Sequence, residues 1–108
     1  MEEHDAILAL GALAQETRLR IFRQLIVAGP QGMTPGQLTE SLGCSPTALS
    51  FHLKELGRAG LVAHQRDGRH LNYRAAIPRM NALLAYLTDH CCQGQPCLAP
   101  TRVDCRDC

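Results

Sequence analysis

Three cysteines lie close together near the carboxyl end of the chain. Cys91, Cys92 and Cys97 fall within seven residues, with Gly94 and Pro96 between the pair and the third thiol. Glycine and proline are the common residues of turns, so the chain can fold back and bring Cys97 to the pair. Thiolates are soft ligands. The spacing therefore predicts a site for one soft metal or metalloid ion.

The number of thiols bears on the identity of that ion. Trivalent arsenic and antimony carry a lone pair and favour three thiolates in a pyramid, whereas zinc normally takes four ligands in a closed tetrahedral site. Cys105 and Cys108 offer a fourth ligand or a second soft-metal site, so zinc and cadmium remain alternatives. Two readings without a ligand also remain: Cys91 as a small packed hydrophobic side chain, and a disulfide between tail cysteines.

Length and composition predict one small cytoplasmic domain. The chain has 108 residues, 45% hydrophobic and 19% charged, which is typical of a globular protein with a single modest core. It lacks an apolar run near the roughly 20 residues that span a bilayer. Its start, Met1–Asp5, is acidic where a signal peptide would be basic. In a reducing compartment, six cysteines indicate metal or metalloid chemistry rather than disulfides.

Apolar periodicity and cap signals predict five helices: 5–14, 16–28, 35–42, 46–59 and 79 to about 90. The third and fourth each begin with an N-cap followed by proline, at Thr34 and Ser45. Gly43 ends the third, and the short link to the fourth makes the two a helix-turn-helix, in which Cys44 is assigned a structural role. Cys91 continues the apolar stripe of the last helix.

Two strands, 61–65 and 70–75, are predicted on either side of the turn signal Asp67-Gly68. Helices followed by a hairpin and a final helix indicate a winged helix-turn-helix, mainly α with a small β-hairpin. We expect residues 1–92 to form the DNA-binding and dimerisation domain and residues 93–108 to form a cysteine-containing tail.

The middle third of the chain is the basic part. Between residues 44 and 74, five Lys and Arg side chains stand against two Asp and Glu: Lys54, Arg58, Arg66, Arg69 and Arg74 against Glu55 and Asp67. Such clustering is expected of a nucleic-acid binder. On helix 46–59, three leucines mark the buried face, and the opposite face carries the candidate DNA contacts Thr47, Ser50, Phe51, Lys54 and Arg58.

The candidate contacts have different roles. Thr47 and Ser50 can hydrogen-bond to bases or phosphates, Phe51 can contact a thymine methyl group, and Lys54 and Arg58 are placed to hold phosphates. On the hairpin, Arg66 and Arg69 are candidates for the DNA backbone or minor groove. His52 lies at the border of the buried face, where a packing role is at least as plausible as DNA contact.

Four segments resemble the ArsR family of metal- and metalloid-responsive repressors: 16–22 (ETRLRIF), 50–56 (SFHLKEL), 59–62 (AGLV) and 66–73 (RDGR with Tyr73). The resemblance covers about residues 5 to 92. It implies a homodimeric winged-helix repressor that leaves double-stranded operator DNA on binding its inducer. This chain departs from the family at Phe51, where members usually carry a polar or basic residue.

The resemblance also bears on the inducer. Many arsenic-sensing members carry Cys-Val-Cys before the recognition helix, but the matching residues 36–40 contain no cysteine, and Asp89-His90 is only a fragment of the Asp/His pairs of zinc-sensing members. The chain is similar to a subgroup with a vicinal cysteine pair at the end of the last helix and a third cysteine shortly after. That likeness implies Cys91, Cys92 and Cys97 as ligands of trivalent arsenic or antimony.

We therefore expect a repressor that dimerises through its first and last helices, binds an operator with an imperfect inverted repeat, and is released by the ion. A zinc- or cadmium-responsive repressor and a thiol-redox repressor share the fold and remain alternatives. A zinc-stabilised interaction module is a further one. An enzyme is not expected, because neither an anion-binding loop nor a thioredoxin-like βαβ unit accompanies the cysteines.

Overall fold

The computed structural model describes residues 1–94 of the chain. Cys97, Cys105 and Cys108 lie outside the described residues, as does nearly all of the predicted tail. The elements follow one another along the chain as α1 (Glu3–Leu13), α2 (Glu16–Ala28), the 3-10 turn η1 (Gly29–Gln31), α3 (Pro35–Leu42), α4 (Pro46–Arg58), β1 (Val62–Asp67), β2 (His70–Ala75), α5 (Ile77–Leu87) and the 3-10 turn η2 (Cys91–Gly94). The order and types confirm the winged helix-turn-helix.

One apolar core holds α2, α3 and α4 together. Its largest fully buried side chains come from these helices and from the start of the hairpin: Ile21, Leu25, Leu38, Leu49, Leu56 and Leu61. Among the described residues, none that is buried is polar or charged. Because burying one such side chain contributes about 1.5–3 kcal/mol, this cluster determines how α4 is seated.

The predicted caps are present at the start of both helices of the helix-turn-helix, α3 and α4. The hydroxyl of Thr34 accepts the N–H of Gln37 at 3.2 Å, and the Gln37 side chain accepts the N–H of Thr34 at 2.9 Å. The hydroxyl of Ser45 accepts the N–H of Ala48 at 3.1 Å at the start of α4. Gly43 ends α3 in the left-handed conformation, with φ 70°. Gly43 and the Ser45 cap set the turn between α3 and α4.

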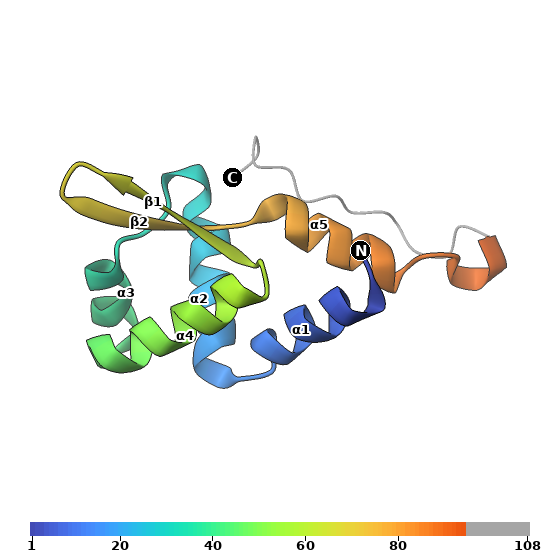
Figure 1. Ribbon diagram of the computed structural model, residues 1–108, viewed down its shortest axis with the longest axis horizontal. Helices are drawn as coiled ribbons and strands as arrows, with labels where there is room; N and C mark the ends of the chain where they lie inside the picture. Colours follow the sequence, from blue (N-terminus) through green and yellow to red (C-terminus); the bar gives the residue numbers. More distant parts are fainter. Residues whose placement is uncertain (95–108) are drawn as a thin grey trace.

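The wing is the antiparallel hairpin β1–β2, paired from Val62↔Ala75 to Asp67↔His70 (Figure 1). β1 extends two residues beyond the predicted strand, so the two turn residues are Gly68-Arg69 rather than Asp67-Gly68. Gly68 has φ 63°, as a glycine at the first central position of a II′ turn requires. The predicted hairpin is confirmed, and its turn lies one residue later.

The base of the wing is attached to the segment before α3. Met33 and Tyr73 exchange two backbone hydrogen bonds, of 2.9 and 2.8 Å. Gly32, with φ 67°, permits this approach, because a Cβ there would lie 2.4 Å from the Tyr73 carbonyl oxygen. The wing is therefore held in a defined position relative to α3.

Helices α1 and α5 lie side by side at the end of the molecule away from the wing (Figure 1). The predicted extent of the last helix was wrong, because α5 begins at Ile77 and ends at Leu87, not near His90. The Thr88 hydroxyl donates to the Leu84 carbonyl at 2.8 Å, and His90 takes a left-handed φ of 58°. Cys91 and Cys92 thus lie in η2, separate from the helix. Across residues 1–94, the structure has no helix long and apolar enough to span a membrane.

Candidate nucleic-acid interface

The outer face of α4 is built by the spacing of its residues. Leu49, Leu53 and Leu56 are buried against the core, and the side chains on the opposite face are exposed, as predicted: Thr47, Ser50, Phe51, Lys54 and Arg58. The capped start of α4 leaves further backbone N–H groups pointing outward, where a phosphate oxygen can accept them. This face can contact a nucleic acid without any change in the packing of α4.

Phe51 is the unusual member of this face. Its ring is 56% exposed, and it packs edge-on to the imidazole of His52 with ring centroids 5.6 Å apart. A large apolar side chain exposed at the surface contributes hydrophobic free energy only when a partner covers it. In a major groove the thymine methyl group supplies such a contact.

His52 is half-buried and contacts Arg18 of α2. The Arg18 Nη1 lies 3.4 Å from the His52 Nδ1. Burial lowers the pKa of His52 below its ordinary value of 6.5, and the positive charge of Arg18 lowers it further. The structure thus places His52 as a neutral side chain between core and surface, which favours the packing interpretation over a charged phosphate contact.

The cations on α4 differ in their surroundings. Arg58 pairs with Glu55 one turn earlier, with 3.7 Å between Nη1 and Oε1. Lys54 forms no ion pair with any carboxylate of residues 1–94, so its charge is available to a phosphate. An exposed pair such as Arg58–Glu55 contributes little, roughly 0.2–1 kcal/mol, so DNA can replace the carboxylate at small cost.

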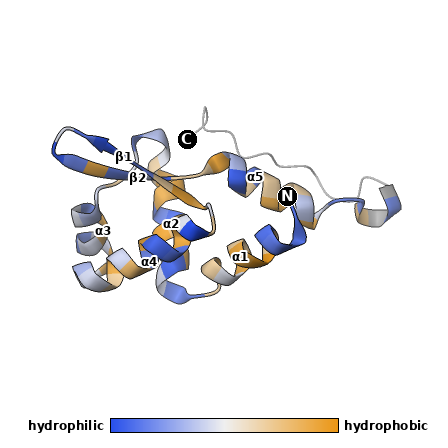
Figure 2. Cartoon of the chain, viewed as in Figure 1, coloured by the Kyte–Doolittle hydropathy of each residue, from blue (hydrophilic) through white to orange (hydrophobic). Residues whose placement is uncertain are grey.

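The wing supplies the remaining predicted contacts. Arg66 and Arg69 are exposed at its outer half, whereas Arg74 near its base donates a hydrogen bond to the side chain of Gln65. Figure 1 shows the wing and α4 in the same half of the molecule, and in Figure 2 the outer part of the wing is strongly hydrophilic. The structure therefore brings all the predicted DNA-contacting residues to one half of the chain.

Two arginines that sequence reasoning did not select connect this half to the other. Arg18 donates from Nε to the Ala12 carbonyl of α1 at 2.7 Å, besides meeting His52. Arg79 of α5 donates to the Ala59 carbonyl at the end of α4 at 3.3 Å and pairs with Asp5 of α1 at 3.6 Å. In the sequence, Arg18 was one of several arginines outside the apolar stripe of its helix, and the ETRLRIF segment holds Arg20 as well, so no local signal singled it out.

The described part of the thiol region is a short turn. Cys91 is half-buried, and its N–H donates to the Thr88 carbonyl at 3.0 Å. Left-handed residues, His90 and Gln93, stand on both sides of the cysteine pair. Within residues 1–94, no three His, Cys, Asp or Glu side chains gather in a way that would hold a metal ion. The third predicted ligand, Cys97, lies outside the described residues.

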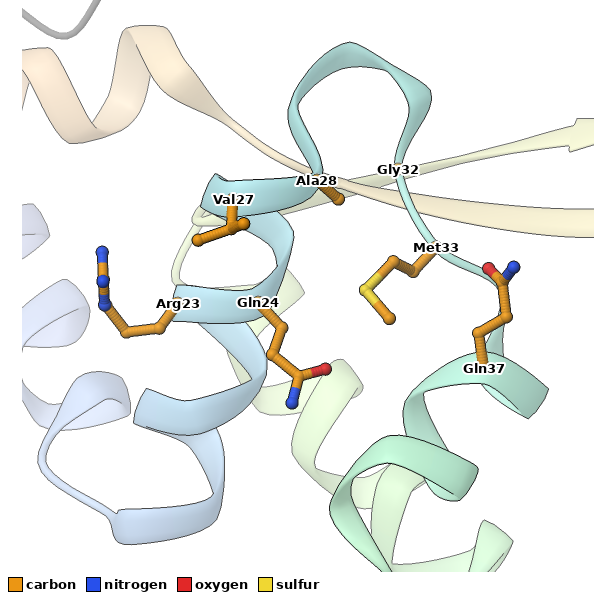
Figure 3. A pocket seen from close by; sticks show the side chains of 7 residues that line it. All are labelled: Arg23, Gln24, Val27, Ala28, Gly32, Met33 and Gln37. Carbon is orange, nitrogen blue, oxygen red and sulfur yellow. The ribbon is translucent and has the colours of Figure 1, made fainter. Parts of the chain in front are cut away.

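A hollow of about 620 Å³ opens between the end of α2 and the start of α3 (Figure 3). The amide of Gln24 and the side chain of Met33 point into the same space from its two walls. The Gln24 Oε1 is buried without a hydrogen-bond partner. The residues that line the hollow include no thiol and no carboxylate, so it does not suit the soft ion that the cysteines predict.

Comparisons with known proteins agree with this geometry. Residues 13–65 match the family model of a helix-turn-helix domain. The regulator YgaV of Escherichia coli is 33% identical over 88 residues, which cover 82% of this chain and 87% of that protein. A Halobacterium salinarum protein named ArsR after an arsenical resistance operon is 38% identical over 78 residues, covering 72% of this chain and 59% of that protein.

Solved structures share the architecture. An ArsR-like transcriptional regulator from Rhodococcus superposes with a TM-score of 0.70 at 30% identity, covering 78% of this chain and 76% of that one. These relatives are DNA-binding regulators and not enzymes. On its fold, its exposed reading helix and these likenesses, the chain belongs to the ArsR family of winged helix-turn-helix transcriptional regulators.

Proposed function

We propose that the protein is a cytoplasmic repressor that binds operator DNA as a homodimer and is released when trivalent arsenic or antimony binds Cys91, Cys92 and Cys97. The observation that carries the proposal is the position of the cysteine pair. It lies on a separate turn immediately beyond α5, a helix that leaves an apolar face exposed. An ion bound there acts directly on the end of that helix.

The exposed apolar side chains of α1 and α5 support the dimer. Ile7, Leu8 and Leu10 of α1 and Leu84, Tyr86 and Leu87 of α5 are each more than a third exposed. The two helices are adjacent at the end away from the wing, and Figure 2 shows hydrophobic residues along α1. Self-association by two-fold symmetry is the commonest way to bury such a surface.

A dimer joined in this way presents two copies of α4 and two wings. Each α4 enters a major groove, with the copies contacting half-sites about 10 bp apart, so the operator is an imperfect inverted repeat. Thr47, Ser50 and Phe51 reach base edges, while Lys54, Arg58, Arg66 and Arg69 contact phosphates or the minor groove. Spacing between the two copies then decides whether the dimer fits its operator.

The end of α5 explains how the ion acts. Neighbouring residues of an α-helix point about 100° apart, so a vicinal pair inside a helix closes on one ion only by unwinding a turn. Because α5 ends at Leu87, the pair lies outside that helix, in the separate 3-10 turn η2, and it can close on an ion without unwinding α5. Closure of the pair on the ion pulls on Thr88, whose N–H and hydroxyl both bond to the Leu84 carbonyl. Leu84 and Leu87, in the dimer face, move with it.

The movement has a route to the reading helix. Arg79 of α5 bonds to the Ala59 carbonyl at the end of α4, and the same guanidinium pairs with Asp5 of α1. A shift of α5 in the dimer therefore displaces the carboxyl end of α4. By linkage, operator binding lowers the affinity for the ion by the same factor as the ion lowers operator affinity.

The test is arsenite-induced release from DNA. A fluorescent duplex that the reduced wild type selects from a random-sequence pool is titrated with protein, and anisotropy is followed while arsenite is added. Cys91→Ser, Cys92→Ser and Cys97→Ser should bind the duplex normally and resist release. Cys44→Ser is the matched control, because Cys44 packs against the core beside the turn between α3 and α4, and it should respond as wild type does.

The same titration separates the alternatives. Release by zinc or cadmium but not arsenite would select a zinc- or cadmium-responsive repressor, and release by peroxide alone would select a redox repressor. Equal release of wild type and Cys92→Ser by arsenite would reject the assigned thiol site.

A further inference from the structure

The Arg18 side chain joins three helices. It leaves α2 and donates from Nε to the Ala12 carbonyl, 2.7 Å away, in the last turn of α1. Carbonyls in that turn lack partners within the helix, and a cation there also meets the negative end of the helix dipole. From Nη1 the same guanidinium reaches the His52 Nδ1 on α4, at 3.4 Å. The Arg18 guanidinium thus connects the end of α1 to α4.

This contact selects one form of His52. A guanidinium has only donors, so the His52 Nδ1 must accept, and the ring must be neutral with its proton on Nε2. Burial and the Arg18 charge, which lower the pKa of His52, act in the same direction. The Nε2–H meets no acceptor in residues 1–94. It is a donor at the border of the exposed face of α4, next to Phe51.

Arg18 also borders a hollow between α1 and α4. This hollow of about 200 Å³ is lined by the charged side chains Arg18, Glu55 and Arg58, and the last two pair with each other. The side chains that α1 contributes to the hollow carry no charge. Arg18 is the cation whose charge acts on His52, and α1 contacts that cation through the Ala12 carbonyl.

We propose that Arg18 is a positioning residue that fixes His52 as an N–H donor to the operator and makes that donor depend on where α1 lies. The proposal rests on the proposed repressor function and adds a route for regulation. With α1 in place, the fork of Arg18 spans Ala12 and His52, and Nε2–H points an uncharged donor at a DNA oxygen. When the dimer helices shift, the Arg18 fork cannot satisfy both partners, and the donor is lost without any contact between DNA and α1.

The first measurement is of the imidazole itself. Nitrogen-15 chemical shifts of His52 in the wild-type protein at pH 7 should show a neutral ring protonated on Nε2. Addition of the selected duplex should shift the Nε2–H resonance. An Nδ1–H ring or a charged imidazolium would overturn the proposal, whether or not any variant folds.

The second measurement is a double-mutant cycle on operator affinity. Arg18→Lys keeps the charge without the fork, and it should weaken binding by roughly tenfold, the size of one charge-assisted hydrogen bond. His52→Gln places an amide nitrogen near the position of Nε2 and needs no tautomer, so in that background Arg18→Lys should cost less than about twofold. Arg20→Gln is the control, because Arg20 pairs with Glu16 on the exposed side of α2, and this variant should leave affinity unchanged.

The outcomes separate the inference from the proposed function. If wild type selects no duplex from the pool, DNA binding fails and the role of Arg18 fails with it. If wild type selects a duplex but the loss from Arg18→Lys is equal in both backgrounds, the repressor stands and the Arg18–His52 link is rejected. A larger loss in the wild-type background, together with the Nε2–H ring, supports the link.

Discussion

The two ends of the molecule differ in how firmly the chain is held. In the half with α3, α4 and the wing, Thr34 and Ser45 cap both helices, and two backbone hydrogen bonds attach the wing to Met33. At the other end, α5 is eleven residues long and Leu83 is its one buried residue, although the helix is fully described. Beyond it the pair Cys91-Cys92 lies on a turn.

This difference suits the proposed sensor. A recognition helix such as α4 transmits a signal only if it moves as a rigid body, so its position has to be determined by packing. A ligand site has to be deformable, so that a few kcal/mol of binding free energy can change its shape. The exposed apolar side chains of α1 and α5 place the proposed ligand site next to the surface where we propose that a second subunit binds.

The largest effect expected within one subunit comes from the rigid half. Leu56→Ala removes a fully buried side chain of α4, so the free energy of unfolding should fall by about 2–5 kcal/mol. Urea denaturation followed by circular dichroism measures the loss. Val27→Ala is the control, because Val27 is 72% exposed and its loss should change stability by no more than about 0.5 kcal/mol. Equal losses in the two variants would break the proposed contrast.

At the other end, a charge should separate the subunits and leave each one folded. Leu87→Asp puts two carboxylates into a symmetric interface, and desolvation of both should weaken the dimer by roughly a hundredfold. Analytical ultracentrifugation measures the dissociation constant, and circular dichroism checks that helix content is kept. A variant that stays dimeric at the same concentration would show that this face of α5 is not the interface.

A smaller effect is expected for a phosphate contact on α4. Lys54→Ala should weaken operator binding for all sequences alike and should reduce the slope of log affinity against log salt by about 1. Anisotropy titrations over a range of salt concentrations give that slope. Arg20→Ala, a cation on the exposed side of α2, should leave the slope unchanged. An unchanged slope in Lys54→Ala would remove Lys54 from the interface.

The smallest effect is a dependence of stability on pH. The pKa of His52 is lower in the folded protein than its unfolded value of about 6.5. At pH values between the folded and the unfolded pKa, the unfolded chain therefore binds more protons than the folded chain does. The contribution of His52 to the free energy of unfolding is therefore complete above about pH 6.5 and is lost as the pH falls through the folded pKa. Urea unfolding at pH 7.5 and 5.5 should show a larger loss for wild type than for His52→Gln. A larger loss in the variant would mean that His52 gains a proton on folding.

The sequence predicted correctly the elements whose bounds are set by interactions between near neighbours in the chain. Caps, turns and apolar periodicity act over three or four residues, and they located α2, α3 and β2 at their observed bounds. The last helix was predicted too long because the apolar stripe continues to Cys91. It stops at Leu87, where a threonine hydroxyl bonds to the Leu84 carbonyl and a left-handed residue follows. The end of α5 is therefore decided by backbone geometry and not by the apolar stripe.

The sequence by itself determined the winged helix-turn-helix, the exposed face of α4 and the cluster of thiols, because each is encoded in the identity and spacing of near neighbours. Only the tertiary structure decided that Arg18 and Arg79 connect α1 and α5 to α4. Each arginine contacts groups on two other elements, and one of those contacts, between Arg18 and His52, joins residues 34 positions apart. Such contacts arise when helices pack at particular angles, and no local pattern records them.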